Sequence, residues 1–149
     1  MAVGDVTSSG YKNAIQLLAA ATATNSPPSG ASAGVAVNQA VLDGGAPRDG
    51  TIFVASTAGS GTMTVTLRLW SYLTAAAVWA PCGTGSTASL RGVLNGGVAI
   101  DEIAADTIAH HEVVGVPWAF DRLYLEITAI GGTATAISAW LVLPTTPND

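Results

Sequence analysis

The densest group of potential metal ligands in the sequence is a His-His-Glu run at residues 110–112, preceded by Asp101, Glu102 and Asp106. Neighbouring residues of a strand point to opposite faces, so the two histidines cannot bind one ion without a bulge. The acidic residues lack the alternating spacing of oxygen ligands in a Ca²⁺ loop. We therefore expect a solvated strand end here, or one histidine in a subunit contact, and no metal.

The sequence contains a single cysteine that could act as a nucleophile, Cys82, within Ala-Pro-Cys-Gly-Thr-Gly. A reactive thiol needs a neighbouring base or positive charge that lowers its pKa, and no such local signature surrounds Cys82. Ser60 lies in a Gly-Ser-Gly turn and lacks the G-x-S-x-G pattern of a nucleophile elbow. The glycine turns at 83–85 and 95–97 lack the lysine of a phosphate loop. These patterns predict a protein that is not an enzyme and holds no cofactor.

Aromatic side chains form the other candidate constellation. Trp and Tyr rings can stack on sugars, but they more often fill a core or a subunit contact. They are Trp70, Tyr72, Trp79, Trp118, Phe120, Tyr124 and Trp140. We favour the core or contact role and keep a glycan-binding platform as the alternative.

Short β-rich segments separated by turn residues must position these side chains. Expected strands cover residues 51–57, 62–72, 75–80, 90–94, 98–103 and 108–116, followed by a final pair of strands within 120–143. Regularly spaced turns without intervening helical runs argue against a parallel α/β fold. The sequence therefore predicts an all-β protein, an antiparallel β-sandwich of about eight strands with an extended or partly helical N-terminal arm.

The final pair of strands carries the clearest alternation in the chain. Leu123, Leu125 and Ile127 alternate with polar residues up to Gly131-Gly132, a pair suited to a two-residue hairpin turn. This register puts Leu123 opposite Trp140. It leaves an apolar second face made by Ile137, Leu141 and Leu143. Such a face predicts a protein whose apolar surface is covered or assembled.

Residues 1–34 differ from the body in composition and predict an N-terminal arm or linker, with the β-sandwich domain at 35–149. Helical spacing of Tyr11, Ala14, Ile15 and Leu18 indicates a short helix, whereas Thr22 to Gly34 has the composition of a flexible linker. The arm is either a partly ordered tail or a segment that orders against a neighbouring subunit. The residues we expect at a subunit interface are Tyr11, Ile15, Leu18, Trp118 and Phe120.

Composition restricts the function classes further. The 149-residue chain is 49% hydrophobic but only 10% charged, where about 25% is usual in soluble domains. This surplus of hydrophobic over charged residues predicts an oligomer or larger assembly. A net charge of −5 with dispersed arginines predicts no nucleic-acid partner, and the short apolar runs predict no membrane helix. The N-terminus lacks the pattern of a secretory signal, so we expect synthesis and folding in a cytoplasm.

Three segments together carry a resemblance to a known class: TMTVTLRLWSY, LRGVLNGGVAIDEIAAD and the strand pair at 120–143. They resemble the small head decoration (cement) proteins of tailed bacteriophages, which have a jelly-roll-like fold. The resemblance implies a homotrimer at threefold positions on the outer capsid surface of the virion, made in the host cytoplasm, that fastens subunits of the major capsid protein. A phage fibre, tail or adhesin module that binds host glycan has the same fold and is the alternative. A β-sandwich hydrolase or cupin-like enzyme requires a metal or triad that the sequence does not supply.

Overall fold

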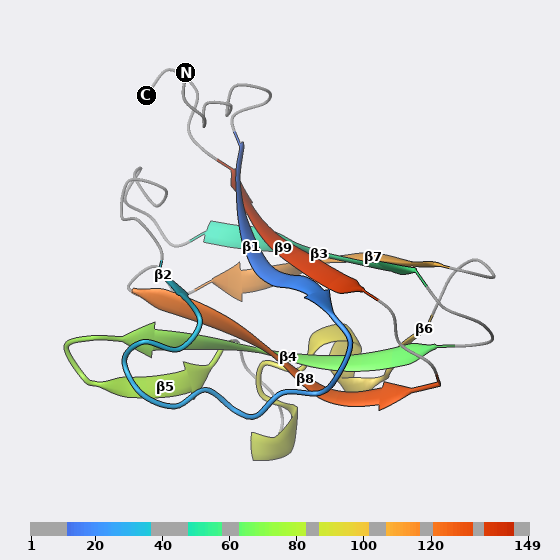
Figure 1. Ribbon diagram of the computed structural model, residues 1–149. Coiled ribbons are helices and arrows are strands. Elements are labelled where there is room, and N and C mark those ends of the chain that lie inside the picture. The colour runs from blue at the N-terminus through green and yellow to red at the C-terminus, as the bar shows by residue number, and fades with distance from the viewer. Residues whose placement is uncertain are drawn as a thin grey trace.

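The computed structural model describes residues 12–36, 48–57, 63–82, 87–101, 107–116, 121–132 and 136–144, which form an all-β protein of two packed antiparallel sheets (Figure 1). The first sheet has the order β1 (Lys12–Ala21), β9 (Ile137–Pro144), β3 (Arg48–Thr57) and β7 (Thr107–Val116). The second has the order β2 (Val35–Ala36), β8 (Arg122–Gly131), β4 (Thr64–Leu73) and β5 (Val78–Pro81), and β6 (Ile100–Asp101) also pairs with β4. Two 3₁₀ turns, η2 (Ala88–Leu90) and η3 (Leu94–Gly97), precede β6. None of the helices formed by the described residues has the length and apolar character of a membrane span.

The strands pair in a nested order, the first with the last and inward from there. β1 pairs with β9, β2 with β8, β3 with β7 and β4 with β5, all antiparallel. Alternate pairs lie in opposite sheets, as in one long ribbon folded over itself. Within each sheet two of these pairs lie side by side, because β9 also pairs with β3 in the first sheet and β8 also pairs with β4 in the second. This wrapping is jelly-roll-like, so the predicted β-sandwich is confirmed.

The core lies between the two sheets and is built from alternating residues of the long strands. In β4 the inward row includes Val65, Leu67 and Leu69, all essentially inaccessible to solvent. The other sheet contributes the inward rows of β3 and β9. The largest fully buried side chains of the core, taking both sheets together, are Ile52, Met63, Leu67, Leu69, Leu123, Leu125, Ile127, Ile137 and Leu141.

The predicted hairpin at the end of the chain is wrong. β8 and β9 lie in different sheets, and the chain crosses between the sheets after Gly131. The crossing turns the apolar row of β9 inward, so Ile137 and Leu141 face the same core as Leu125. Two glycines fit a tight hairpin turn, but burying both apolar rows decides the topology.

The consecutive strands expected at 51–57 and 62–72 do not pair with each other, because β3 and β4 lie in opposite sheets. A tight connection instead joins β4 to β5, where residues 74–77 form the turn and Ala77 has a positive φ of 54°. Asp121 accepts a hydrogen bond from the Thr74 backbone N–H at 2.6 Å and holds this turn against the start of β8. The strand expected at 90–94 reduces to one bridge, between Val93 and Arg68, flanked by the 3₁₀ turns.

The N-terminal segment is extended, and from Lys12 onward it belongs to the sandwich. Residues 12–21 form β1, so the expected helix and the expected boundary at residue 34 are wrong for this part. The register shifts between Gln16 and Leu18 and again between Leu18 and Ala21. These bulges turn residues three apart toward the core, which reproduces helical spacing in a strand.

Candidate functional site

The outer face of the second sheet is covered by the chain itself. Residues 22–34, here called the strap, run over this face from β1 to β2 (Figure 1). Beneath the strap, the Trp79 ring packs against Tyr72 and Tyr124, with ring centroids 5.0 and 6.1 Å apart. Tyr72 points outward from β4 and is nevertheless buried. The strap therefore shields the aromatic surface of this sheet.

Side chains of the second sheet hold the strap mainly through its backbone carbonyls. Tyr124 donates to the carbonyl of Ser26 at 2.7 Å and Trp79 Nε1 to that of Gly30 at 2.9 Å. Arg122 donates to three further carbonyls, those of Ser32, Ala33 and Gly34. The strap is thus fixed at several points along its length.

Asn25 gives the strap a different attachment, along the free edge of β8. The backbone N–H of Ile127 donates to Asn25 Oδ1 at 2.6 Å, and the side-chain amide of Asn25 donates to the carbonyl of Leu125 at 3.3 Å. The Asn25 backbone N–H also donates to Ile127 O at 3.3 Å. One residue therefore takes the place of a neighbouring strand at an edge where β2 pairs only with residues 122 and 123.

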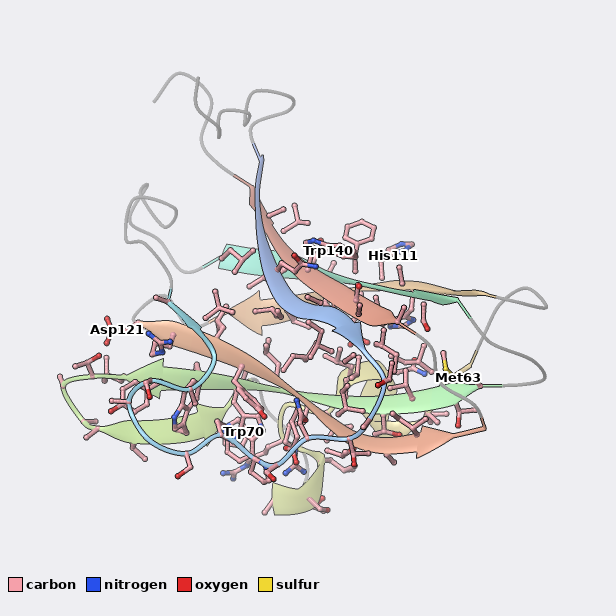
Figure 2. All side chains as sticks on the ribbon, viewed as in Figure 1. Met63, Trp70, His111, Asp121 and Trp140 are labelled. Carbon is pink, nitrogen blue, oxygen red and sulfur yellow. The ribbon has the colours of Figure 1, made fainter. Side chains whose placement is uncertain are left out.

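The outer face of the first sheet has no comparable cover from the described residues. Figure 2 shows Trp140 and His111 on this side, with Trp70 at the opposite side of the molecule. Phe53 is 45% exposed and Val113 is 65% exposed. We call this surface the open face. Its side chains are Ala14, Gln16, Thr51, Phe53, Ala55, His111, Val113, Ser138, Trp140 and Val142.

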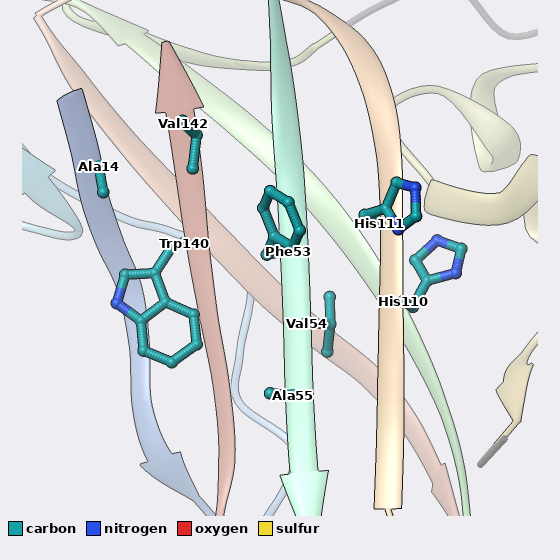
Figure 3. A pocket seen from close by; sticks show the side chains of 8 residues that line it. All are labelled: Ala14, Phe53, Val54, Ala55, His110, His111, Trp140 and Val142. Atoms are coloured by element: carbon teal, nitrogen blue, oxygen red, sulfur yellow. The ribbon is translucent and has the colours of Figure 1, made fainter. Parts of the chain in front are cut away.

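A slot of about 460 Å³ lies in the open face (Figure 3). Phe53 is the register partner of both Trp140 and His111, so the three rings come from three adjacent strands. The Phe53 and His111 rings stack with centroids 5.6 Å apart. Small and aliphatic side chains complete a lining that offers few polar groups. The lining residues are Ala14, Phe53, Val54, Ala55, His110, His111, Trp140 and Val142.

The two adjacent histidines diverge as the strand geometry predicts. His111 points to the open face, whereas His110 lies 2.9 Å from Glu112 Oε1 on the other side of β7. Glu112 Oε1 also accepts the Asn95 backbone N–H at 2.7 Å, which ties β7 to η3. Within the described ranges, no three His, Cys, Asp or Glu side chains are grouped to hold a metal ion.

Cys82 lies buried at the end of β5, where its backbone N–H donates to Leu69. Burial raises the pKa of its thiol to about 11, although a hydrogen bond with Ser71 opposes this effect. The thiolate is therefore scarce at neutral pH, and Cys82 has the properties of a small core residue.

Of the residues expected at a subunit interface, the structure describes Ile15 and Leu18. Leu18 is 8% exposed within the core of its own chain, and the partly buried Ile15 packs against that core. The interface role of these two residues stays a prediction. Tyr11, Trp118 and Phe120 lie outside the described residues. The open face was missed because its rings come from strands far apart in sequence. One feature of the sequence could have indicated this face: among the outward-facing residues of β3 is Phe53, at a position where a solvent-exposed strand usually has a polar residue.

Comparison with known proteins adds no assignment: no family model, curated protein or solved structure matches this chain.

Proposed function

We propose that this chain is a non-enzymatic structural protein of a bacteriophage virion, a capsid decoration (cement) protein. In this function it binds the outer capsid surface as a homotrimer and stabilises contacts between major capsid subunits. The open face carries the proposal, because no described segment covers it and Phe53 and Val113 remain exposed there. Among the ten side chains that the structure describes on this face, only His111 is ionisable, which suits burial against another protein.

One outer sheet face is covered by the strap and the other is left open by the described residues. This contrast supports the view that the open face associates with another protein, and that its exposed apolar side chains are not there by chance. An exposed phenylalanine or valine alone is ordinary, but here Phe53, Val113 and Trp140 lie on one continuous sheet surface. The low charged fraction of the chain, 10%, points the same way. The slot favours an apolar protein contact over the glycan alternative, because sugar hydroxyls need several hydrogen-bonding partners and the lining supplies few.

A matched pair of variants tests this proposal. Val113 and Val98 are 65% and 67% exposed, but Val113 lies on the open face and Val98 follows η3 elsewhere. We expect Val113→Arg to lower oligomer mass and capsid occupancy, because association would bury an unpaired charge. Val98→Arg should match the wild type in both.

Mass photometry of the protein alone and with expanded capsids measures both quantities. A monodisperse monomer at micromolar concentration, with no capsid binding by the wild type, would remove the proposal. Binding on a glycan array without capsid binding would favour the adhesin alternative.

A further inference from the structure

β7 forms one edge of the first sheet, and its outer side has no backbone partner among the residues that the structure describes. It pairs with β3 over all ten residues from Thr107 to Val116 without a register shift, so this edge is long and regular. An antiparallel strand with one neighbour directs about half of its backbone N–H and C=O groups away from that neighbour. Such a row of donors and acceptors is a template for another strand.

The other described sheet edges are interrupted in ways that oppose pairing with another strand. β1, at the far edge of the first sheet, contains two register shifts. In the second sheet β5 has only four residues and ends at Pro81, and Asn25 occupies the edge of β8. Bulges, short strands, prolines and lysines are the usual means of blocking an edge. β7 has none of them: its sequence, TIAHHEVVGV, contains neither lysine nor proline, and its pairing with β3 has no bulge.

The described side chains and neighbours of β7 also leave its edge accessible. His111 is exposed, and Val113 is 65% exposed. η3 contacts β7 at a side chain and not at the backbone, because the Asn95 N–H donates to Glu112 Oε1. The backbone groups on the outer side of β7 therefore remain available to a strand from another chain.

The sequence of β7 is complementary to itself in an antiparallel pair. Side chains on one face of a sheet meet only side chains on the same face, so one residue of β7 must lie opposite its own copy. If this residue is His111, then His110 of each copy lies opposite Glu112 of the other, and an imidazole faces a carboxylate twice. Centring the pair on Glu112 would oppose two carboxylates, which is destabilising. Centring it on His110 would oppose the two imidazoles and leave both carboxylates without one.

We propose that β7 of one copy pairs antiparallel with β7 of a second copy, with the twofold axis at His111. The two first sheets then form one sheet of eight strands in the order β1-β9-β3-β7-β7-β3-β9-β1. Because this axis is perpendicular to the sheet, both open faces lie on the same side and form one continuous apolar surface. The contact goes beyond the homotrimer proposed above, since a twofold contact joins protomers of different trimers.

Cysteine cross-linking of the full-length protein tests both the pairing and its register. Residues directly opposite each other in an antiparallel pair have Cα atoms about 4.5–5.5 Å apart, a separation that a disulfide can bridge. We expect His111→Cys to form covalent dimers on mild oxidation, as seen by non-reducing gel electrophoresis. Val113→Cys is the matched control on the same strand and face, because its two copies would be offset by roughly 13 Å along the strands. The wild type should not cross-link, since Cys82 is buried.

Covalent dimers of His111→Cys without dimers of Val113→Cys are the expected result. Equal cross-linking of the two variants would mean that copies meet without this register, and no cross-linking of His111→Cys would mean that the β7 edges do not meet. Either result overturns the proposal.

Hydrogen exchange of the wild type gives a second test that needs no substitution. As the protein concentration rises, the β7 amides that point away from β3 should exchange more slowly by at least about tenfold. The amides of β4, which already has neighbours on both sides, should not change. Exchange at the β7 edge that is independent of concentration would also overturn the pairing. Capsid occupancy plays no part in either measurement, so the pairing can fail while the proposed function holds.

Discussion

The two outer faces of the sandwich carry similar aromatic side chains but differ in what lies over them. On the second sheet, Trp79 and Tyr124 donate to strap carbonyls, and the rings are shielded. On the first sheet, Phe53 and Trp140 flank a slot that the described residues leave open. A sandwich whose strap covers one outer face, while the described residues leave the other face open, is suited to association with another protein. Exposure alone would not support that inference, since single exposed apolar residues are common.

The largest expected change in stability distinguishes the core-facing side chains of β9 from its outward-facing side chains. Leu141 is fully buried, so Leu141→Ala should leave a cavity and lower the free energy of unfolding by about 2–5 kcal/mol. Trp140→Ala removes a larger side chain from the open face and should cost clearly less stability while reducing association. Urea denaturation of both variants measures the difference. Equal losses of stability would mean that Trp140 supports the fold of its own protomer.

The sequence predicts the inner rows well and the outer contacts poorly. Alternation identifies Leu67 and Leu125 as core residues, because burial of one strand face leaves a period of two in the sequence. It does not reveal which strands pair, so the local Gly131-Gly132 signal suggested a hairpin where the chain changes sheets. In β1, two bulges converted a strand into helical spacing.

The strap was the least predictable element. Its residues are mainly small or polar, and composition cannot tell a flexible linker from a segment fixed by distant donors. Arg122 and Tyr124 hold it from positions about 90 to 100 residues away in sequence. Similarly, the slot is formed by Phe53, His111 and Trp140, which only the jelly-roll pairing brings side by side.

A second prediction concerns the end of the strap, where Gly34 has φ of 69° and a Cβ would collide with the carbonyl oxygen of Leu123. Gly30 has φ of 80° but open space around it. Both alanine substitutions should incur about 1–2 kcal/mol for the left-handed backbone. Gly34→Ala should be further destabilised by the collision. Equal losses of unfolding free energy would show that the strap end shifts to accommodate the added methyl group.

A third prediction concerns the edge of β8. Asn25→Ala removes the acceptor for the Ile127 N–H and the donor to Leu125, so it should lower the free energy of unfolding by about 1–3 kcal/mol. Thr24→Ala alters an exposed neighbour in the strap and should have little effect. Hydrogen exchange at the Ile127 amide checks the local consequence. Unchanged protection of this amide in Asn25→Ala would contradict the edge-strand role of Asn25.

The smallest expected effect depends on pH and tests whether the Tyr124 hydroxyl fastens the strap. Burial, and secondly the negative charge of Glu126, raise the pKa of Tyr124 above its ordinary value of 10.0. Folding therefore favours the neutral phenol, whose contribution is fully present below pH 10 and is lost as the pH rises through the folded-state pKa. The phenolate cannot donate to the Ser26 carbonyl.

Tyr124→Phe lacks this hydrogen bond at every pH. We expect it to be less stable than the wild type by about 1 kcal/mol near neutral pH, with the difference shrinking above pH 10. The Cys82 thiol also titrates in this range, with a pKa of about 11, but both proteins contain it and its effect cancels in the difference. Urea denaturation of the two proteins across a pH series measures that difference. A constant difference above pH 10 would assign the effect of the substitution to packing, and the strap would then depend on its other attachments.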